Sequence, residues 1–160
     1  MAGIEHMGPG LAAKQFAPLV PLWILMISAE VIDIIFGIFY LAGIENTKFA
    51  PWSHGLFMAV IWSILFGIIG FLYYKDKRSG IVIGLLVFSH WVVDFITHPM
   101  GIVMGPDAKP DMPLFFSETP RYGLGLYNTL PGAIFGITVL IVPGLVMYLI
   151  YRRKLKNNLN

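Results

Sequence analysis

The chain contains no cysteine among its 160 residues. This absence excludes a disulfide scaffold, thiolate metal sites and cysteine nucleophiles. Charged residues are also scarce, since they make up only 12% of the chain, against roughly 25% in a soluble domain. The formal net charge of +2 is too small for a nucleic-acid-binding module. We therefore expect no nucleic acid among the partners.

The chain also lacks several common catalytic motifs. It has no Gly-x-Ser-x-Gly, no phosphate-binding loop, no His-Glu-x-x-His and no dinucleotide fingerprint. Apolar residues instead make up 57% of the sequence, and the mean hydropathy is +0.74. A soluble globule of this length could not bury so much apolar surface. The composition predicts an all-α integral membrane protein, with residues 1–160 forming a single membrane domain.

Four apolar stretches are long enough to cross a bilayer, which requires about 20 helical residues. Single strands would leave their backbone unsatisfied in lipid, so each stretch should be a helix and the fold a four-transmembrane-helix bundle. We also expect a short N-terminal segment at the membrane interface. The predicted spans are about 21–43, 55–74, 80–104 and 130–151, with an outer loop at 105–128.

Basic residues between the spans predict the orientation of the chain. Eight of them fall on one side of the membrane and three on the other. The positive-inside rule then predicts a multi-pass plasma-membrane protein with both termini in the cytoplasm and an external 105–128 loop. The eight are Lys14, Lys75, Lys77, Arg78, Arg152, Arg153, Lys154 and Lys156, and the three are Lys48, Lys109 and Arg121.

Ionisable residues within the spans indicate a polar site. In the third span His90, Asp94 and His98 are spaced i, i+4 and i+8, so they share one helix face. Side chains four residues apart lie about 5–6 Å apart, close enough for one metal ion to bind both. For His98 alone, a hydrogen-bonded packing role is an equally good interpretation.

The first two spans carry polar residues at a matching depth. Glu30 and Asp33 share a face of the first span, and His54 begins the second. Together with His90 and Asp94 they predict a divalent metal site in the outer half of the bundle. Their oxygen and nitrogen donors suit zinc, manganese or iron, and we expect zinc.

Each of these acids also has a simpler interpretation. Asp33 could form a structural pair with one histidine, and Asp94 could pair with Arg121 or Lys109 of the outer loop. Glu30 could be protonated by desolvation and bonded to a backbone carbonyl. A shared site is favoured because several costly ionisable groups occur at one depth with helical spacing.

Two motifs give the chain a family resemblance. They are Pro-Trp-Ser-His-Gly-Leu at 51–56 and Phe-Ser-His-Trp-Val-Val-Asp-Phe-Ile-Thr-His-Pro at 88–99. With them the chain resembles the YdjM-like family of small bacterial and archaeal inner-membrane proteins, commonly described as membrane-bound metal-dependent hydrolases. A branch labelled permease or uncharacterised is more similar still. It shares the His6 to Lys14 segment and the Gly-Leu-Gly-Leu-aromatic-Asn pattern at 123–128.

The resemblance implies a set of metal ligands. They would be His54, His90 and Asp94, with Asp33 and His6 as further candidates. A distant relation of the family to zinc-dependent phospholipase C enzymes implies phosphoester hydrolysis. The chain departs from the family pattern at Gly55, where a serine is usual, and at 99–101, where Pro-Met-Gly replaces Arg-Pro-Asp.

Two hypotheses about function follow. In the first, the protein is a metal-dependent hydrolase of a phosphoester or lipid-derived substrate. His54, His90 and Asp94 hold the ion, and Asp33 or Glu30 is a bridging ligand or general base. In the second, a non-enzymatic membrane subunit or transporter-like protein uses the same residues for ion binding or assembly. The expected partners are membrane lipid, other membrane proteins or further copies of this chain.

Overall fold

The structure is a computed structural model that describes residues 4–105, 107 and 112–158. Lys109 and Asp111 of the expected outer loop lie outside the described residues. Apart from one short hairpin, the regular structure in the described ranges is helical. In chain order the elements are η1 (Ile4–His6), α1 (Met7–Ala13), α2 (Leu22–Leu41), α3 (Leu56–Tyr74), α4 (Lys77–Thr97), α5 (Gly101–Met104), β1 (Met112–Pro113), β2 (Arg121–Tyr122), η2 (Leu126–Asn128) and α6 (Leu130–Asn157).

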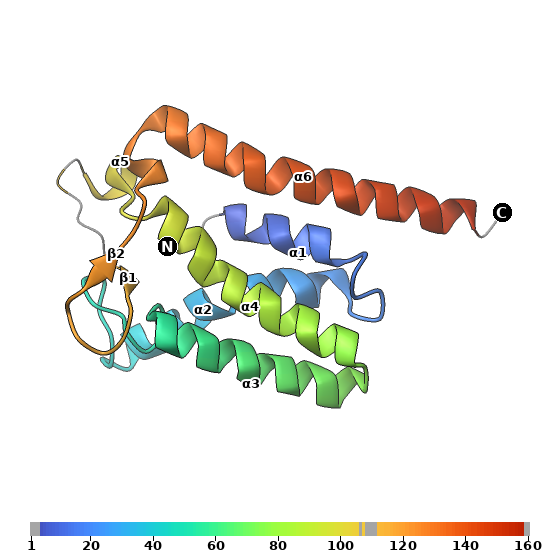
Figure 1. Cartoon of the computed structure of the whole chain (residues 1–160), viewed down its shortest axis with the longest axis horizontal. Coiled ribbons are helices and arrows are strands. Elements are labelled where there is room, and N and C mark those ends of the chain that lie inside the picture. The colour runs from blue at the N-terminus through green and yellow to red at the C-terminus, as the bar shows by residue number, and fades with distance from the viewer. Residues whose placement is uncertain (1–3, 106, 108–111, 159–160) are drawn as a thin grey trace.

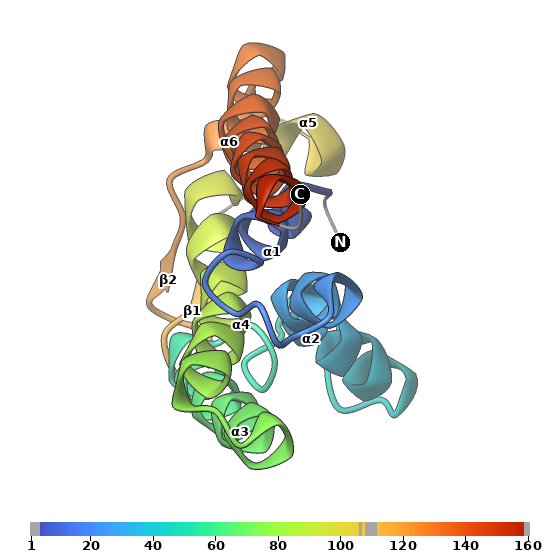
Figure 2. The same ribbon diagram turned by 90° about the vertical axis from the view of Figure 1, so that its right-hand side faces the viewer.

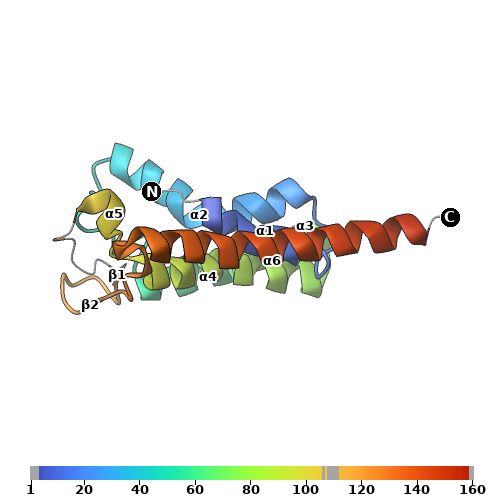
Figure 3. The same cartoon turned by 90° about the horizontal axis from the view of Figure 1, so that it is seen from above.

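Four helices confirm the predicted spans. α2, α3, α4 and α6 contain 20, 19, 21 and 28 residues, and each is apolar enough to cross a membrane. Their long axes run along the same direction of the molecule (Figure 1). α6 is longer than predicted, because it continues through the basic residues that follow the apolar run and extends past the other helices (Figure 3). The all-α fold with four candidate spans is therefore as expected.

α4 is the central helix of the bundle. It packs against α3, α2 and α1, as the end-on view shows (Figure 2). Its contact with α3 is close because both helices carry glycine there. A Cβ added to Gly80 would lie 2.7 Å from the carbonyl oxygen of Gly67. More than half of the most apolar part of α4 is buried inside the protein, whereas α3 and α6 leave most of theirs for lipid.

Residues at both ends of α4 explain its length. Asp76 caps its start, because the backbone N–H and the hydroxyl of Ser79 both donate to its carboxylate, at 2.8 and 2.6 Å. These hydrogen bonds hold the pKa of Asp76 below its ordinary value. At the other end the helix stops at Thr97, seven residues before the predicted end of the span at 104. Pro99 explains this difference, because the residue before a proline avoids the helical conformation and His98 is extended.

The N-terminal segment differs from its predicted place at the membrane interface. η1 and α1 instead lie inside the bundle, where α1 packs against α2, α4 and α6 (Figures 1 and 2). Small residues allow this insertion: a Cβ added to Gly8 would lie 2.1 Å from the carbonyl oxygen of Leu140 on α6. His6 is consequently only 1% exposed and Glu5 only 3%.

The segments that the charge pattern assigns to opposite sides of the membrane lie at opposite ends of the bundle. The end of α1, the turn between α3 and α4 and the end of α6 lie toward the same end of the molecule (Figure 1). There Arg78 donates a hydrogen bond to the carbonyl oxygen of Gln15. At the opposite end Arg121 donates to the carbonyl oxygen of Lys48 at 2.9 Å. Which end faces the cytoplasm stays a prediction.

Candidate metal centre

Two residues of α4 form the centre of a buried polar cluster. His90 and Asp94 are 1% and 2% exposed and lie one helical turn apart. His90 Nε2 is 3.3 Å from Asp94 Oδ2. The two oxygens of Asp94 face different histidines, since Oδ2 faces His90 and His54 while Oδ1 faces His6 and His98. The carboxylate of Asp94 therefore connects both halves of the cluster.

α2 contributes two acids to the same region. Asp33 Oδ1 is 3.7 Å from His90 Nε2, so α2 and α4 are neighbours with their polar faces together, as the helical spacing predicts. Both carboxylate oxygens of Glu30 are buried without a hydrogen-bond partner among the described residues. Glu30 interacts electrostatically with His6 and His90. It is therefore a buried acid beside the cluster whose oxygens are not engaged by a hydrogen bond.

His54 reaches the cluster from the turn that precedes α3. Its Nε2 lies 3.2 Å from Asp33 Oδ1 and 3.4 Å from Asp94 Oδ2. Its other ring nitrogen, Nδ1, is 2.8 Å from the hydroxyl oxygen of Ser53. That hydroxyl donates its only hydrogen to Glu45 at 2.7 Å, so its oxygen accepts the Nδ1–H of His54. When the ring is neutral, Nε2 of His54 carries the lone pair, and this nitrogen faces the two aspartates.

His90 is oriented in a similar way by the backbone of α2. Its Nδ1 lies 2.7 Å from the carbonyl oxygen of Ala29. A carbonyl oxygen only accepts hydrogen bonds, so Nδ1 carries the hydrogen and the neutral ring has its lone pair on Nε2. Outer partners of this kind fix the tautomer and orientation of metal-binding histidines. His54 and His90 therefore both present Nε2 to the same carboxylates.

The other two histidines, His6 and His98, face the second carboxylate oxygen of Asp94, Oδ1. His6 stacks on His90 with ring centroids 3.9 Å apart, and its Nε2 is 3.3 Å from Asp94 Oδ1. His98, at the end of α4, places its Nε2 3.8 Å from the same oxygen. All four histidines of the chain thus face one aspartate.

The distances around Asp33, His54, His90 and Asp94 suit a metal ion. A zinc ion with ligands at about 2.1 Å in a tetrahedron separates neighbouring ligand atoms by about 3.4 Å. The separations between the facing nitrogens and oxygens are 3.2, 3.3, 3.4 and 3.7 Å. The nitrogen and oxygen donors of the cluster also match the chemistry of zinc, manganese and iron. The cluster therefore has the donor set and spacing to hold a divalent ion.

Several ring nitrogens of the cluster are left without a clear hydrogen-bond partner in the part of the chain that the structure describes. His90 Nε2 and both ring nitrogens of His6 are buried without a hydrogen-bond partner among the described residues. A lone pair on Nε2 and a carboxylate oxygen 3.3 Å away repel one another unless a cation lies between them. A metal ion supplies that cation. A proton on Nε2 is the alternative, at the cost of an imidazolium buried within the membrane.

The structure answers whether Asp94 pairs with Arg121 and whether Asp33 pairs with a single histidine. Arg121, a candidate partner of Asp94, donates instead to the carbonyl oxygens of Glu118 and Lys48. Lys109, the other candidate, lies outside the described residues. Asp33 contacts two histidines, His54 and His90, and so is not part of a simple pair with one of them.

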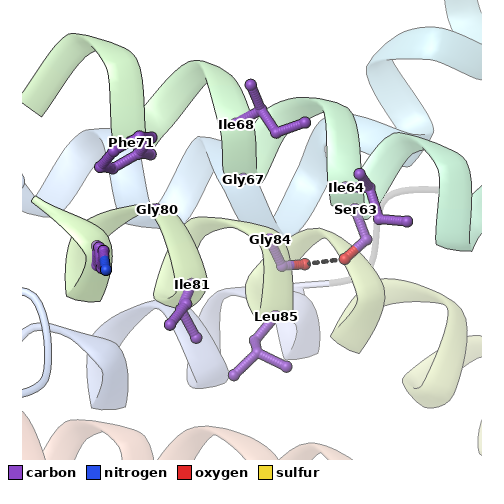
Figure 4. Close-up of a pocket in the computed structure, with 10 residues that line it drawn as sticks. Ser63, Ile64, Gly67, Ile68, Phe71, Gly80, Ile81, Gly84 and Leu85 are labelled. Atoms are coloured by element: carbon purple, nitrogen blue, oxygen red, sulfur yellow. Dashed lines mark hydrogen bonds between the residues drawn. The ribbon is translucent and has the colours of Figure 1, made fainter. Parts of the chain in front are cut away.

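Two grooves on the bundle are separate from the polar cluster. The first, of about 410 Å³, runs along the contact of α3 and α4 beside Gly67 and Gly84, where Ser63 donates to the Gly84 carbonyl (Figure 4). The second, of about 440 Å³, lies between α2 and α3. Both are lined mainly by apolar side chains, and neither includes a residue of the cluster.

Glu45 and Ser53 are parts of the site that the sequence did not indicate as functional. Glu45 accepts hydrogen bonds from the backbone N–H groups of Trp52 and Ser53 as well as from the Ser53 hydroxyl. An isolated acid in a loop gives no periodic signal. The only available clue was the adjacency of Ser53 to His54, which suggested a supporting or packing role.

Comparisons with known proteins add no relative: no family model, curated protein or solved structure matches this chain. The geometry of the cluster is therefore the basis for its function.

Proposed function

We propose that this protein is a membrane-embedded metal-dependent hydrolase whose buried His/Asp cluster holds a divalent ion, zinc by preference. The observation that carries the proposal is the convergence of His54 Nε2 and His90 Nε2 on Asp33 and Asp94 at 3.2–3.7 Å. The YdjM-like motifs at 51–56 and 88–99 support the same assignment. His54, His90 and Asp94 are ligands, and Asp33 completes the set.

The proposed reaction is hydrolysis of a phosphoester or lipid-derived substrate. A divalent ion lowers the pKa of water and polarises a phosphoryl or carbonyl oxygen. Glu30, whose oxygens have no hydrogen-bond partner among the described residues, accepts the proton of the attacking water. The side chains of Asp33 and His54 retain 11% and 13% exposure, so water and substrate approach from their side of the cluster.

Metal analysis is the first test. Protein purified from zinc-supplemented membranes is expected to contain the ion, and His90→Ala or Asp94→Ala should lose it. Ser89→Ala is the matched control, because its hydroxyl bonds only the carbonyl of Leu86 and lies on the same helix. Unchanged metal content in both ligand variants, or a wild type without metal, contradicts the assignment.

Hydrolysis is tested separately with a phosphodiester lipid analogue in detergent. Glu30→Gln should keep the metal and lose activity by roughly 10²–10⁴-fold, the usual contribution of a general base. Metal binding without hydrolysis of any ester class would instead support the second candidate, a transporter-like or accessory membrane protein. Two observations favour that candidate: four protein donors, if all of them bind, would leave a tetrahedral ion no open position, and the apolar grooves do not include the cluster.

A further inference from the structure

Asp94 is positioned to serve two cations at once. Its two oxygens face opposite groups of histidines, with His54 and His90 near Oδ2 and His6 and His98 near Oδ1. The donors near Oδ2, with Asp33, complete the set assigned above. His6 and His98 are not needed for that set. They form a second group of nitrogen donors around the opposite oxygen of the same carboxylate.

His6 is the strongest indication of a second ion. Its side chain has no exposure, and neither ring nitrogen has a hydrogen-bond partner among the described residues. Leaving such a polar group buried without a partner is unfavourable. Its Nε2 is nevertheless 3.3 Å from Asp94 Oδ1, close to the separation of two ligands on one ion. His6, His90 and Asp94 form one group of possible ligands and Asp33, His54 and His90 form another, so the two groups share His90, which is assigned to the first ion. His98 Nε2, 3.8 Å from Asp94 Oδ1, is the further nitrogen near His6.

Two protonated histidines, His6 and His90, are an unfavourable explanation for the contacts on this side of the cluster. The rings of His6 and His90 are stacked nearly parallel, with an angle of 10° between them. Two stacked imidazolium rings would place like charges 3.9 Å apart in a low-dielectric interior, which is strongly unfavourable. At least one ring is therefore neutral. Where the nitrogen that faces Asp94 carries the lone pair of the neutral ring, a cation between the two atoms removes their repulsion.

The charge of the region also fits two divalent ions. Four carboxylates lie in or beside the cluster, those of Glu5, Glu30, Asp33 and Asp94, and Glu5 interacts electrostatically with Glu30. The carboxylate of Glu45 is separate from these four, because it accepts hydrogen bonds from the loop at Trp52 and Ser53. Lysine and arginine are absent from residues 15–47, 49–74 and 79–108, which include most of α2, α3 and α4. Four negative charges in the membrane interior are costly without counter-charge. Two divalent cations would neutralise them.

We propose that the cluster binds a second divalent cation between His6 and Asp94 Oδ1, with His98 as a further donor and Asp94 bridging the two ions. This inference rests on the proposed function, because it adds an ion to the same cluster. Paired ions roughly 3.5–4 Å apart are the arrangement that many phosphoesterases use to hold both sides of a reacting phosphoryl group. The substrate class it favours is accordingly a phosphoester rather than a carboxylic ester.

The test is the number of Mn²⁺ ions that each chain binds. Purified protein in detergent is stripped with chelator and reloaded with Mn²⁺, and bound metal is counted after desalting. Low-temperature electron paramagnetic resonance then distinguishes a coupled pair of ions from an isolated one. We expect two ions and a coupled spectrum for the wild type, and one uncoupled ion for His6→Ala. Met7→Ala, the adjacent change on the same segment, should keep both ions.

The outcomes separate this inference from the function on which it rests. One ion in the wild type, without coupling, overturns the second site and leaves the first. No ion at all overturns both. Two coupled ions that persist in His6→Ala overturn the role of His6. If His6→Ala does not fold, His6→Gln preserves most of the side-chain volume and the expected loss of one ion is measured on that variant.

Discussion

The orientation of His54 depends on a short chain of hydrogen bonds that begins in a loop. Glu45 fixes the Ser53 hydroxyl, and that hydroxyl accepts the Nδ1–H of His54. Supporting partners of this type typically contribute 10–100-fold to metal affinity. Ser53→Ala removes the acceptor and leaves a partly buried N–H unsatisfied. We expect metal affinity to fall by about 10–100-fold, with the number of ions bound at saturation unchanged. Competition with a fluorescent chelator measures this change.

A second serine supplies the control for that prediction. The Ser63 hydroxyl donates to the Gly84 carbonyl between α3 and α4, away from the cluster. Ser63→Ala removes a hydrogen bond of similar kind without touching a ligand, so its metal affinity should match the wild type. Equal affinities for Ser53→Ala and Ser63→Ala would show that the orienting chain has no effect on the metal.

The polar residues of the cluster differ in how well the sequence predicts them. His90 and Asp94 were predictable as neighbours because the α-helix places i and i+4 on one face. The meeting of Asp33, His54 and Asp94 followed from matched depth, which the spans define. The place of Glu45 was not predictable, because a loop has no fixed period and its path depends on tertiary contacts.

Among the elements, α1 depends most on close packing of backbone. A Cβ at Gly8 would lie 2.1 Å from the Leu140 carbonyl oxygen, and one at Gly144 would lie 2.2 Å from the Gly8 carbonyl oxygen. Gly8→Ala must push α1 away from α6, because the obstructing atom is backbone and cannot rotate aside. We expect a loss of about 1–3 kcal/mol in stability. We also expect weaker binding of the second ion proposed above, and thermal unfolding in detergent and Mn²⁺ counting measure the two effects.

Gly37 on α2 provides the matched control for this substitution. No atom lies within 4 Å of a Cβ added there, so Gly37→Ala meets open space. Its stability should change by no more than about 1 kcal/mol, in the stabilising direction expected for alanine in a helix. A similar loss of stability in Gly8→Ala and Gly37→Ala would argue against the tight contact of α1 with α6.

Hydropathy predicts the four long spans but not the short helix α1. The four spans are long apolar runs, so their existence follows from the thickness of the bilayer. α1 has only seven residues and includes a proline and two glycines, so it lacks the length of a span. Its small residues at 8, 10 and 13 were the available signal for close packing, since all three are buried. Pro99 was likewise the available signal that α4 ends before it.

At the scale of the whole molecule, the bundle surrounds its ionisable groups with apolar helices. α4 lies at the centre and carries His90 and Asp94, whereas the outer faces of α3 and α6 are left for lipid. The inward placement of these groups follows from the cost of exposing charge to hydrocarbon. The inserted α1 adds His6 from within the bundle. The pairing of α2 with α4 was predictable from their polar faces. The packing of α3 on α4 and of α1 on α6 was not, because hydropathy defines which segments span but not which apolar faces meet.

The orientation of the whole bundle is the remaining prediction. In the sequence, eight basic residues flank the spans on one side of the membrane and three on the other, so the end of the bundle that carries the last turns of α6 should be cytoplasmic. The chain has no cysteine, so single cysteines can be introduced directly. Ser117, between β1 and β2, and Lys156, near the end of α6, are both exposed and are replaced one at a time by cysteine. The β1–β2 hairpin and the end of α6 lie at opposite ends of the molecule (Figure 1). In intact cells an impermeant maleimide should label the first, and the second should react only after the membrane is opened. The reverse pattern would place the basic end outside and contradict the assigned orientation.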